Sequence, residues 1–455
     1  MLTDTVAAIS TGGNNTGINI IRISGDKSKK IIDKIFTKAG KLDHQKIIYG
    51  KIKDNDKILD EVLVSYFKAP NSFTGEDVCE INCHGGRRIT LDILELVIKE
   101  GAILAEPGEF SKRAFLNGKM DLSKAESIID MINAKTKLQT KIASEQLEGG
   151  LYNVVKSERN KLIELLAQIE VSIDYPEYDY EELENNEIQE KINEISNNLR
   201  KYIDSYDEGK YIKNGINVAI LGGTNAGKSS LLNALSNSEK AIVTDIEGTT
   251  RDIVEETVII NDVVLNIFDT AGIRETEDVV EKIGIKRSLE IIDKVDFIIL
   301  VIDLVKGITQ KDVELIKKIE EQNKKYIICL NKKDISHENI DKIKGQIGSS
   351  KNVIETSFLT KEGIDTLKNK IVYMFNLEQI TNNDDIIIVN QRHKELLERA
   401  LDSLIKAKNE ICAEVGVDIA EINIKNSAKY LGEIIGEEVT NDIINKIFEK
   451  FCLGK

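Results

Sequence analysis

The chain has 455 residues, enough for about three domains, and its formal charge of −15 excludes the broadly basic surface of a dedicated nucleic-acid binder. Five cysteines at irregular spacing exclude a disulfide framework and favour a reducing compartment. No apolar run is long enough to span a bilayer, and Met1–Thr5 lacks the basic end and apolar stretch of a secretory signal. We therefore expect a cytoplasmic protein with no membrane partner.

Residues 1 to about 118 combine short β-branched runs with glycine-bearing turns. The runs Ile18–Ile23 and Val62–Phe67 predict strands, and Ile89–Lys99 predicts a helix. The sequence therefore indicates a small α+β domain at this end of the chain.

From Leu122 the pattern changes to that of long helices. One helical face is marked by apolar residues at three- and four-residue spacing: Leu162, Leu165, Leu166, Ile169 and Ile173. The acidic stretch Asp174–Glu184 predicts a solvated break, after which helical character resumes to about Asp207. After about Asp385 the chain again predicts helices to its end.

Between these helical parts, residues 216 to about 375 alternate strand-like and helical segments. The predicted strands are Ile216–Leu221, Val263–Phe268, Phe297–Ile302, Tyr326–Leu330 and Asn352–Thr356. Strands that alternate with helices predict a parallel sheet with right-handed crossovers. The chain therefore indicates one helical domain, split in sequence, with an α/β domain inserted into it.

The first of these strands runs into a glycine-rich segment, Gly222–Ser229, with the spacing of a phosphate-binding loop. Gly222 and Gly227 allow the backbone N–H groups to wrap a phosphate at the start of the helix from Ser229. Lys228 is expected to neutralise the β- and γ-phosphates, and the Ser229 hydroxyl to ligate Mg²⁺. A strand before the segment and a helix after it disfavour the alternative of a chance glycine-rich turn.

Two further segments match those that contact Mg²⁺ or the γ-phosphate in nucleotide-hydrolysing P-loop domains. Thr249–Asp252 falls where the first switch loop lies, and Thr250 is expected to ligate Mg²⁺ only when the γ-phosphate is present. Asp269 follows a buried strand and is expected to hold a magnesium-bound water. Gly272, three residues later, leaves room for its N–H to meet the γ-phosphate.

Asn331 and Asp334, in the segment Asn331-Lys332-Lys333-Asp334, are expected to select the base of the nucleotide. A carboxylate at position 334 accepts from the guanine N1–H and exocyclic amine, and adenine would leave it unpaired. Lys332 is expected to cover the base with its stem, and Ser357 to support it. With the phosphate loop and Asp269–Gly272, this segment predicts a GTP-hydrolysing domain.

The glutamine that orients water in Ras-like enzymes is replaced by Ile273. Hydrolysis therefore needs a substitute, and the acidic stretch Glu275–Glu281 contains several candidates that spacing alone does not separate. The competing interpretation of this stretch is an exposed charged loop.

Several strings are distinctive in combination: Pro107–Phe110 running into Arg113–Lys119, Asn225–Ser230, Gly248–Asp252, Asp269–Gly284 and the terminal Phe451–Lys455. Together they resemble the bacterial and organellar tRNA modification GTPases called MnmE or TrmE, over essentially the whole chain. The resemblance implies a multidomain α/β and α+β protein with a tetrahydrofolate-binding and dimerisation domain at 1–118. A helical domain at 119–211 and 379–455 would accept a Ras-like P-loop GTPase domain at 212–378 as an insertion.

The resemblance also implies a folate site. Arg22, Glu80, Lys119 and Lys455 match positions that contact a 5-formyl- or methylene-tetrahydrofolate one-carbon donor. The cations can meet the glutamate carboxylates of folate, and Glu80 can accept from the pterin N–H groups. Without the family, each would be an unremarkable charged residue.

Potassium-dependent hydrolysis is a further implication of the resemblance. The matching potassium ligands are Asn225, Thr244, Ile246 and Thr249. A cation beside the β- and γ-phosphates supplies the charge that an arginine finger supplies elsewhere. Glu281 matches the water-orienting acid, and it would act with Lys228 and Asn225 as the catalytic set.

The whole nucleotide site implied in this way has four parts. They are Asn225, Ala226, Gly227, Lys228, Ser229 and Ser230; Thr244, Asp245, Ile246, Glu247, Gly248, Thr249 and Thr250; Asp269, Thr270, Ala271 and Gly272; and Asn331, Lys332, Asp334 and Ser357. Thr224 replaces the family's proline and Phe358 its alanine, and we expect these departures to loosen the phosphate loop and lower nucleotide affinity.

The cysteines allow two interpretations each. Cys452 is either a nucleophile toward the uracil ring or a small apolar residue that packs the terminal helix, and we favour packing because no histidine lies near it in sequence. Cys79, Cys83 and His84 have metal-like spacing, but the chain offers no second ligand pair, which favours core cysteines.

The first functional interpretation is a homodimeric, potassium-stimulated GTPase that modifies tRNA with an FAD-dependent partner, forming a heterotetramer. It would add a carboxymethylaminomethyl or aminomethyl group to C5 of the wobble uridine. The alternative is a GTP-dependent binding switch in ribosome assembly, but the C-terminal helices carry many acids and no basic Gly-x-x-Gly loop. A third interpretation, a membrane-remodelling GTPase, lacks an amphipathic lipid-inserting helix.

Overall fold

The computed structural model describes residues 4–12, 16–38, 42–174, 185–236, 254–268, 291–337, 340–347, 352–377, 387–413 and 417–454. The chain forms two compact units: Met1–Ile129 with Glu145–Ser196 and Arg399–Lys455, and Asp130–Ser144 with Asn197–Glu398. No helix within the described ranges is long and apolar enough to cross a membrane.

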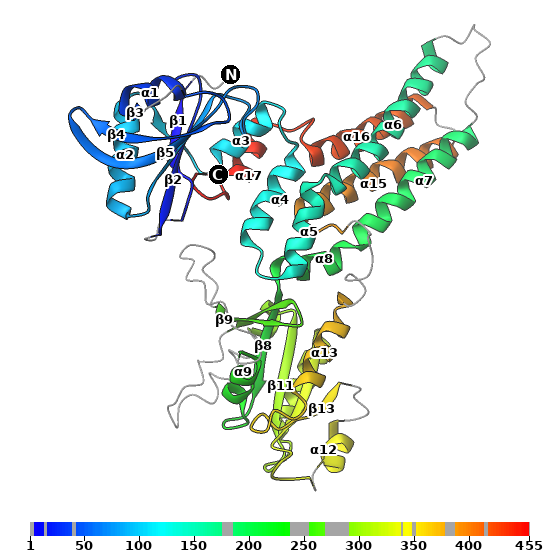
Figure 1. Cartoon of the computed structure of the whole chain (residues 1–455). Coiled ribbons are helices and arrows are strands. Elements are labelled where there is room, and N and C mark those ends of the chain that lie inside the picture. The colour runs from blue at the N-terminus through cyan, green and yellow to red at the C-terminus, as the bar shows by residue number, and fades with distance from the viewer. Residues whose placement is uncertain are drawn as a thin grey trace. The chain divides into compact units, whose positions relative to one another are not determined.

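The first unit opens with a seven-stranded sheet in the order β3-β4-β5-β6-β2-β1-β7 (Figure 1). Neighbouring strands are antiparallel except for the parallel pair β1 and β7. The strands are β1 (Val6–Ile9), β2 (Ile18–Ser24), β3 (Phe36–Lys38), β4 (Ile47–Asp54), β5 (Lys57–Phe67), β6 (Val78–His84) and β7 (Ile103–Leu104). Both predicted strands are confirmed, and the predicted helix is α2 (Arg87–Lys99).

The two faces of this sheet differ because side chains alternate along each strand. Ile21, Ile23 and Ile81 lie in one apolar core with residues of α1 (Ser28–Ile35) and α2. Arg22 of β2 and its neighbour Glu80 of β6 lie between these buried positions and are half-buried on the opposite face. A smaller core joins β1 to Phe110 of α3 (Glu109–Leu116).

The helical part of the chain contains α4 (Leu122–Asn133), α5 (Lys137–Leu147), α6 (Gly150–Asp174), α7 (Asn185–Asp204), α15 (Gln391–Cys412), α16 (Val417–Ile435) and α17 (Asn441–Phe448). Helices α6 and α16 pack along each other within the first unit (Figure 1). The predicted apolar face of α6 is confirmed at Leu162, Leu165, Leu166 and Ile169, which are buried. The side chain of Ile173 and most of the predicted acidic break lie outside the described residues.

The second unit contains a six-stranded sheet in the order β13-β12-β11-β8-β10-β9. Its strands are β8 (Ile216–Gly222), β9 (Val254–Ile260), β10 (Val263–Phe268), β11 (Phe297–Asp303), β12 (Lys325–Asn331) and β13 (Val353–Glu355). The five predicted strands are confirmed and are parallel to one another.

The sheet has one further strand that the sequence analysis did not predict, β9, which pairs antiparallel with β10 at the edge. The turn between them contains only Asn261 and Asp262, both with positive φ (44° and 65°). Asparagine and aspartate tolerate this left-handed conformation, which suits a two-residue hairpin turn. The run before Asn261 is β-branched, so an Asn-Asp hairpin was readable from the sequence.

Helices pack on both faces of this sheet: α8 (Tyr206–Asn214), α9 (Lys228–Ser236), α11 (Gln310–Glu321), α12 (Ile340–Ile347) and α13 (Ile364–Met374). Alternate residues of each buried strand point to opposite cores, as Ile299 and Leu300 do in β11. Leu138 and Ile142 of α5 belong to the same core as α9 and α13. The start of α5 is therefore part of the nucleotide-domain core.

A carboxylate holds this helix start in place. Asp262 in the β9–β10 turn accepts the backbone N–H groups of Lys137 at 2.9 Å and Leu138 at 2.7 Å. The first N–H groups of a helix have no partner within the helix, so Asp262 satisfies donors that would otherwise be unpaired.

Candidate functional site

The phosphate loop joins the end of β8 to the start of α9. Gly222 and Gly227 have φ values of 143° and 108°, which side chains rarely adopt. A Cβ atom on Gly222 would lie 2.2 Å from the Val301 carbonyl oxygen, and one on Gly227 would lie 2.3 Å from Nδ2 of Asn331. Only glycine fits at both positions, so the predicted glycine roles are explained by close contacts of the loop with β11 and β12.

Lys228 places its ammonium group over this loop. Its Nζ donates to the carbonyl oxygens of Gly222 and Gly223, each at 2.8 Å. Burial lowers the pKa of Lys228, because the charged form loses contact with water. A cation that is partly desolvated at a helix start attracts a phosphate strongly.

Asn331 connects the phosphate loop to the loop after β13. Its Nδ2 donates to the Ala226 carbonyl at 2.8 Å, and its Oδ1 accepts from the Phe358 N–H at 3.1 Å. The side chain is 4 % exposed, so both bonds are shielded from water. Asn331 therefore ties two loops together by hydrogen bonds: the phosphate loop and the loop after β13, where Ser357 was predicted to support the base.

The neighbouring predicted residues differ in exposure. Lys332, with φ of 70°, bonds to Asp303 at the end of β11 at 2.6 Å, which holds its side chain along the loop. Asp334 is exposed. Ser357 is buried, and its hydroxyl accepts the Thr360 N–H at 3.3 Å. The Asp334 carboxylate is thus accessible to a ligand, while the Ser357 side chain stabilises its own loop.

Asn225, Ser229 and Ser230 are exposed at the loop and the first turn of α9, and Ala226 is buried. The remaining predicted nucleotide, metal and catalytic residues lie outside the described residues: Thr244, Asp245, Ile246, Glu247, Gly248, Thr249, Thr250, Asp269, Thr270, Ala271, Gly272 and Glu281. The described part of the site is therefore the phosphate loop and the base-recognition segments.

Of the four predicted folate residues, three lie within the described residues and one does not. Arg22 and Glu80 are directly opposite each other on β2 and β6 and form an ion pair at 2.9 Å. Lys119 is exposed and donates to the Pro70 carbonyl at 3.0 Å. Lys455 lies outside the described residues, but its neighbour Gly454 accepts the Ser10 hydroxyl at 3.0 Å. The end of the chain therefore returns to the end of β1, next to the strand that carries Arg22.

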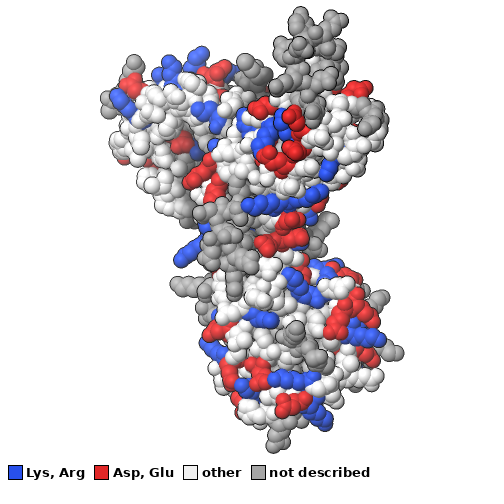
Figure 2. Space-filling view, turned by 90° about the vertical axis from the view of Figure 1, so that its right-hand side faces the viewer, with Lys and Arg blue, Asp and Glu red and all other residues white. Residues whose placement is uncertain are grey.

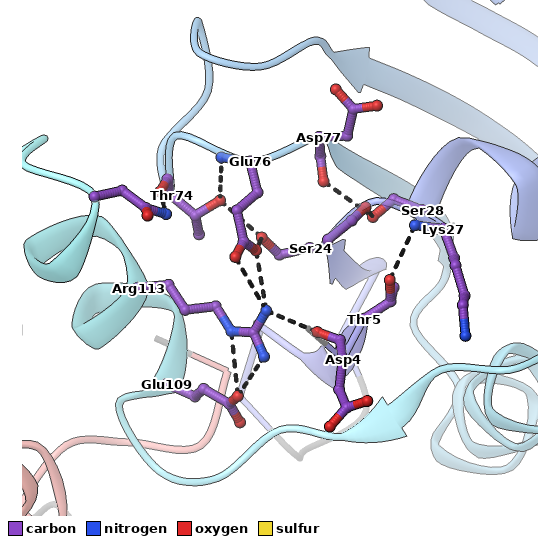
Figure 3. A network of polar contacts seen from close by, with 12 residues as sticks. Asp4, Thr5, Ser24, Lys27, Ser28, Thr74, Glu76, Asp77, Glu109 and Arg113 are labelled. Carbon is purple, nitrogen blue, oxygen red and sulfur yellow. Dashed lines mark hydrogen bonds and ion pairs between the residues drawn. The ribbon is translucent and has the colours of Figure 1, made fainter. Parts of the chain in front are cut away.

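A buried arginine beside these residues was not identified from the sequence. Arg113 of α3 is 2 % exposed and bonds to Glu76, Glu109 and the Asp4 carbonyl (Figure 3). The four-residue spacing of Glu109 and Arg113, which brings the two side chains together on a helix, was the available signal. Glu76 lies 37 positions away, so its part in the network was not readable.

The cysteine predictions have mixed outcomes. The five cysteines form no disulfide bond, and Cys79 and Cys83 are buried in the sheet core, as expected. His84 pairs with Asp60 at 2.7 Å, and the described residues contain no cluster of three or more metal-ligating side chains. The packing interpretation of Cys452 is wrong, because that residue is exposed while its neighbour Phe451 fills the apolar contact.

A glycine-bent phosphate loop between strand and helix, tied by asparagine to an Asn-Lys-x-Asp segment, defines the class of P-loop GTP-binding proteins. Two family models match the chain: the MnmE helical domain over residues 122–452 and the GTP-binding protein TrmE N-terminus over residues 5–119. The chain belongs to the tRNA modification GTPase family MnmE, which is a family of enzymes.

Two relatives illustrate the match. The tRNA modification GTPase MnmE of Acetivibrio thermocellus is 49 % identical over 460 residues, covering 99 % of each chain. That of Clostridioides difficile is 43 % identical over 457 residues, again covering 99 % of each. Among solved structures, the G domain of the T. maritima FeoB iron transporter is 29 % identical, covers 35 % of this chain and 97 % of its own, and has a TM-score of 0.26.

Proposed function

We propose that this chain binds GTP with Mg²⁺ and hydrolyses it in the course of tRNA modification. The observation that carries the proposal is the Asn331 tie, which assembles the phosphate loop and the base-recognition loop in one place. The exposed Ser229 hydroxyl at the first turn of α9 fits a magnesium ligand, with Thr250 as the second. Asp269, Thr270, Ala271 and Gly272 would complete the γ-phosphate side.

Calorimetry with GDP and ADP tests this proposal on the purified chain. We expect a preference for the guanine nucleotide of more than about a hundredfold, because adenine would leave the Asp334 carboxylate unpaired. Equal affinity for the two nucleotides would contradict it.

Potassium is proposed to stimulate hydrolysis. Asn225 is exposed at the tip of the phosphate loop with φ of 61°, which supports a ligand role toward a cation beside the phosphates. Thr244, Ile246 and Thr249 would supply the other ligands. Hydrolysis is expected to be faster in potassium than in sodium, and Asn225→Ala is expected to remove the difference. Equal rates for the wild-type chain would exclude this cation site.

Glu281 is proposed to orient the attacking water in the position that Ile273 leaves vacant. The variant Glu281→Ala is expected to slow turnover while GTP affinity stays nearly unchanged. A large loss of affinity would instead indicate a structural role.

A reduced folate, as 5-formyl- or methylene-tetrahydrofolate, is proposed to bind at Arg22, Glu80, Lys119 and Lys455. The Arg22–Glu80 pair and the return of Gly454 to Ser10 support one site formed by both ends of the chain. Removal of Phe451–Lys455 is expected to abolish folate binding and spare GTP hydrolysis. Unchanged folate affinity in this variant would exclude Lys455.

A homodimer formed through the N-terminal domain is proposed. The sheet face that carries Arg22 also carries exposed apolar side chains on β4, β5 and β2: Tyr49 at 57 %, Leu63 at 43 % and Ile18 at 61 %. Apolar side chains exposed together on one face support an interface there. Light scattering is expected to give the mass of a dimer for the wild-type chain and of a monomer for Tyr49→Asp with Leu63→Asp. A wild-type monomer would refute this part.

The tRNA reaction is proposed to place a carboxymethylaminomethyl or aminomethyl group on C5 of the wobble uridine, with an FAD-dependent partner in a heterotetramer. On the face in Figure 2, acidic and basic side chains of the described residues are interspersed, so the partner is expected to supply part of the positive field for tRNA. Mass spectrometry of wobble nucleosides from cells with and without the protein tests this. Unchanged nucleosides with a ribosome-assembly defect would favour a binding switch instead. A cytoplasmic location stays a prediction.

A further inference from the structure

We propose that Arg113 is a positioning residue of the folate site: it fixes the loop 68–77, which holds Phe73 against Arg22 and receives Lys119. This inference rests on the proposed folate function, because Arg22 and Lys119 are the side chains that would touch the ligand. Arg113 itself is 2 % exposed and would act only through other residues.

All three nitrogens of the Arg113 guanidinium group donate hydrogen bonds. Nη1 donates to the Asp4 carbonyl at 2.8 Å and to both carboxylate oxygens of Glu76 at 3.2 and 3.1 Å. Nη2 and Nε donate to Glu109 at 2.7 and 3.2 Å. One cation thus compensates two half-buried carboxylates, and Figure 3 shows both pointing at it from α3 and from the loop. Without Arg113 the two carboxylates would repel each other, so Glu76 would move away.

Glu76 transmits this constraint to the loop. Its carboxylate accepts the Ser24 hydroxyl of β2 at 2.7 Å, and Ser24 also bonds to the Thr74 hydroxyl at 2.7 Å. The Glu76 N–H donates to Thr74 Oγ1 at 3.2 Å, and Asn117 donates to the Thr74 carbonyl at 2.8 Å. The loop is therefore tied to β2 and to the segment after α3 directly after Phe73, at Thr74 and Glu76.

The ligand side of the loop consists of two contacts. Cζ of Arg22 lies 5.4 Å from the centre of the Phe73 ring and 5.6 Å from the centre of the Phe110 ring. Cation–π attraction to both rings restrains the guanidinium group of Arg22. Lys119 reaches the loop through the Pro70 carbonyl at 3.0 Å. A displaced loop would release both cations from the geometry that a folate with its glutamate carboxylates requires.

The test compares Arg113→Met with Arg159→Met in the full-length chain. Arg159 is the matched control, since it also pairs with two carboxylates, Glu437 at 2.7 Å and Glu438 at 3.0 Å, but contacts helix α16 rather than the loop. Binding of 5-formyltetrahydrofolate, GTP hydrolysis and the thermal midpoint are measured for each. Arg113→Met is expected to weaken folate binding at least about tenfold, as a misplaced binding group does, with hydrolysis unchanged. Arg159→Met is expected to lower the thermal midpoint and leave folate affinity unchanged.

Ser24→Ala provides a milder perturbation in case Arg113→Met does not fold. This variant keeps the ion pairs and removes only the hydroxyl between Glu76 and Thr74. We expect folate binding about threefold weaker, which is less than 1 kcal/mol because a tenfold change in affinity corresponds to about 1.4 kcal/mol. If the wild-type chain binds folate and both variants bind it with the same affinity, the role of Arg113 is overturned while the folate proposal stands. A wild-type chain that binds no folate would overturn the folate proposal and this inference with it.

Discussion

Replacing Asn331 by alanine removes both hydrogen bonds that join the phosphate loop to the loop of Phe358. The Ala226 carbonyl and the Phe358 N–H would lose their partner at a position that is 4 % exposed in the wild type. A buried backbone group without a partner costs about 1–3 kcal/mol, so the two groups together predict a loss of about 2–6 kcal/mol in the free energy of unfolding. Nucleotide affinity would fall as well, because the two loops would separate.

Urea unfolding measures this loss, and hydrogen exchange followed by mass spectrometry locates it. Exchange is expected to accelerate in peptides that contain Phe358 and the phosphate loop, and to stay slow in the N-terminal sheet. The matched control is Asp334→Ala in the same segment. Asp334 is exposed, so its loss is expected to change stability by less than about 0.5 kcal/mol while it removes the preference for guanine. An Asn331→Ala chain with wild-type stability and unchanged exchange at Phe358 would refute the tie.

Two further substitutions and one labelling experiment have defined outcomes. Asp262→Ala is expected to lower the free energy of unfolding by about 1 kcal/mol through loss of the α5 cap, with Asp262→Asn retaining part of it; equal stability of wild type and alanine variant in urea would argue against the cap. Gly227→Ala is expected to weaken GTP binding by more than about tenfold, because its Cβ would collide with the Asn331 amide, and calorimetry showing wild-type affinity would contradict the loop geometry. Burial raises the pKa of the Cys329 thiol to about 12. At neutral pH a disulfide reagent is therefore expected to modify the exposed Cys412 and Cys452 rapidly and Cys329 only in urea. Rapid labelling of Cys329 in the folded chain would disprove its burial.

The strands of the nucleotide sheet and the phosphate loop were predictable because each is specified by neighbouring residues. An apolar run such as that of β11 is buried on both faces and reads as a strand without knowledge of its partners. Gly222 and Gly227 mark a backbone that other residues cannot adopt, and their spacing before Lys228 is local. The folate, potassium and partner predictions, by contrast, came from resemblance. Their residues and the domain boundaries at 118, 211 and 378 stay predictions.

Only the tertiary structure decided which distant residues meet. The sequence associated Asn331 with the base, but its bonds to Ala226 and Phe358 depend on the parallel order of β8, β11, β12 and β13. In the sequence Arg113 had no recognisable role, because its partner Glu76 is distant along the chain and only the fold brings the two together. Local patterns report how a segment prefers to fold, because propensity and alternation act over a few residues. A buried ion pair or a tie between loops depends on how whole sheets and helices pack, and that information is spread over the chain.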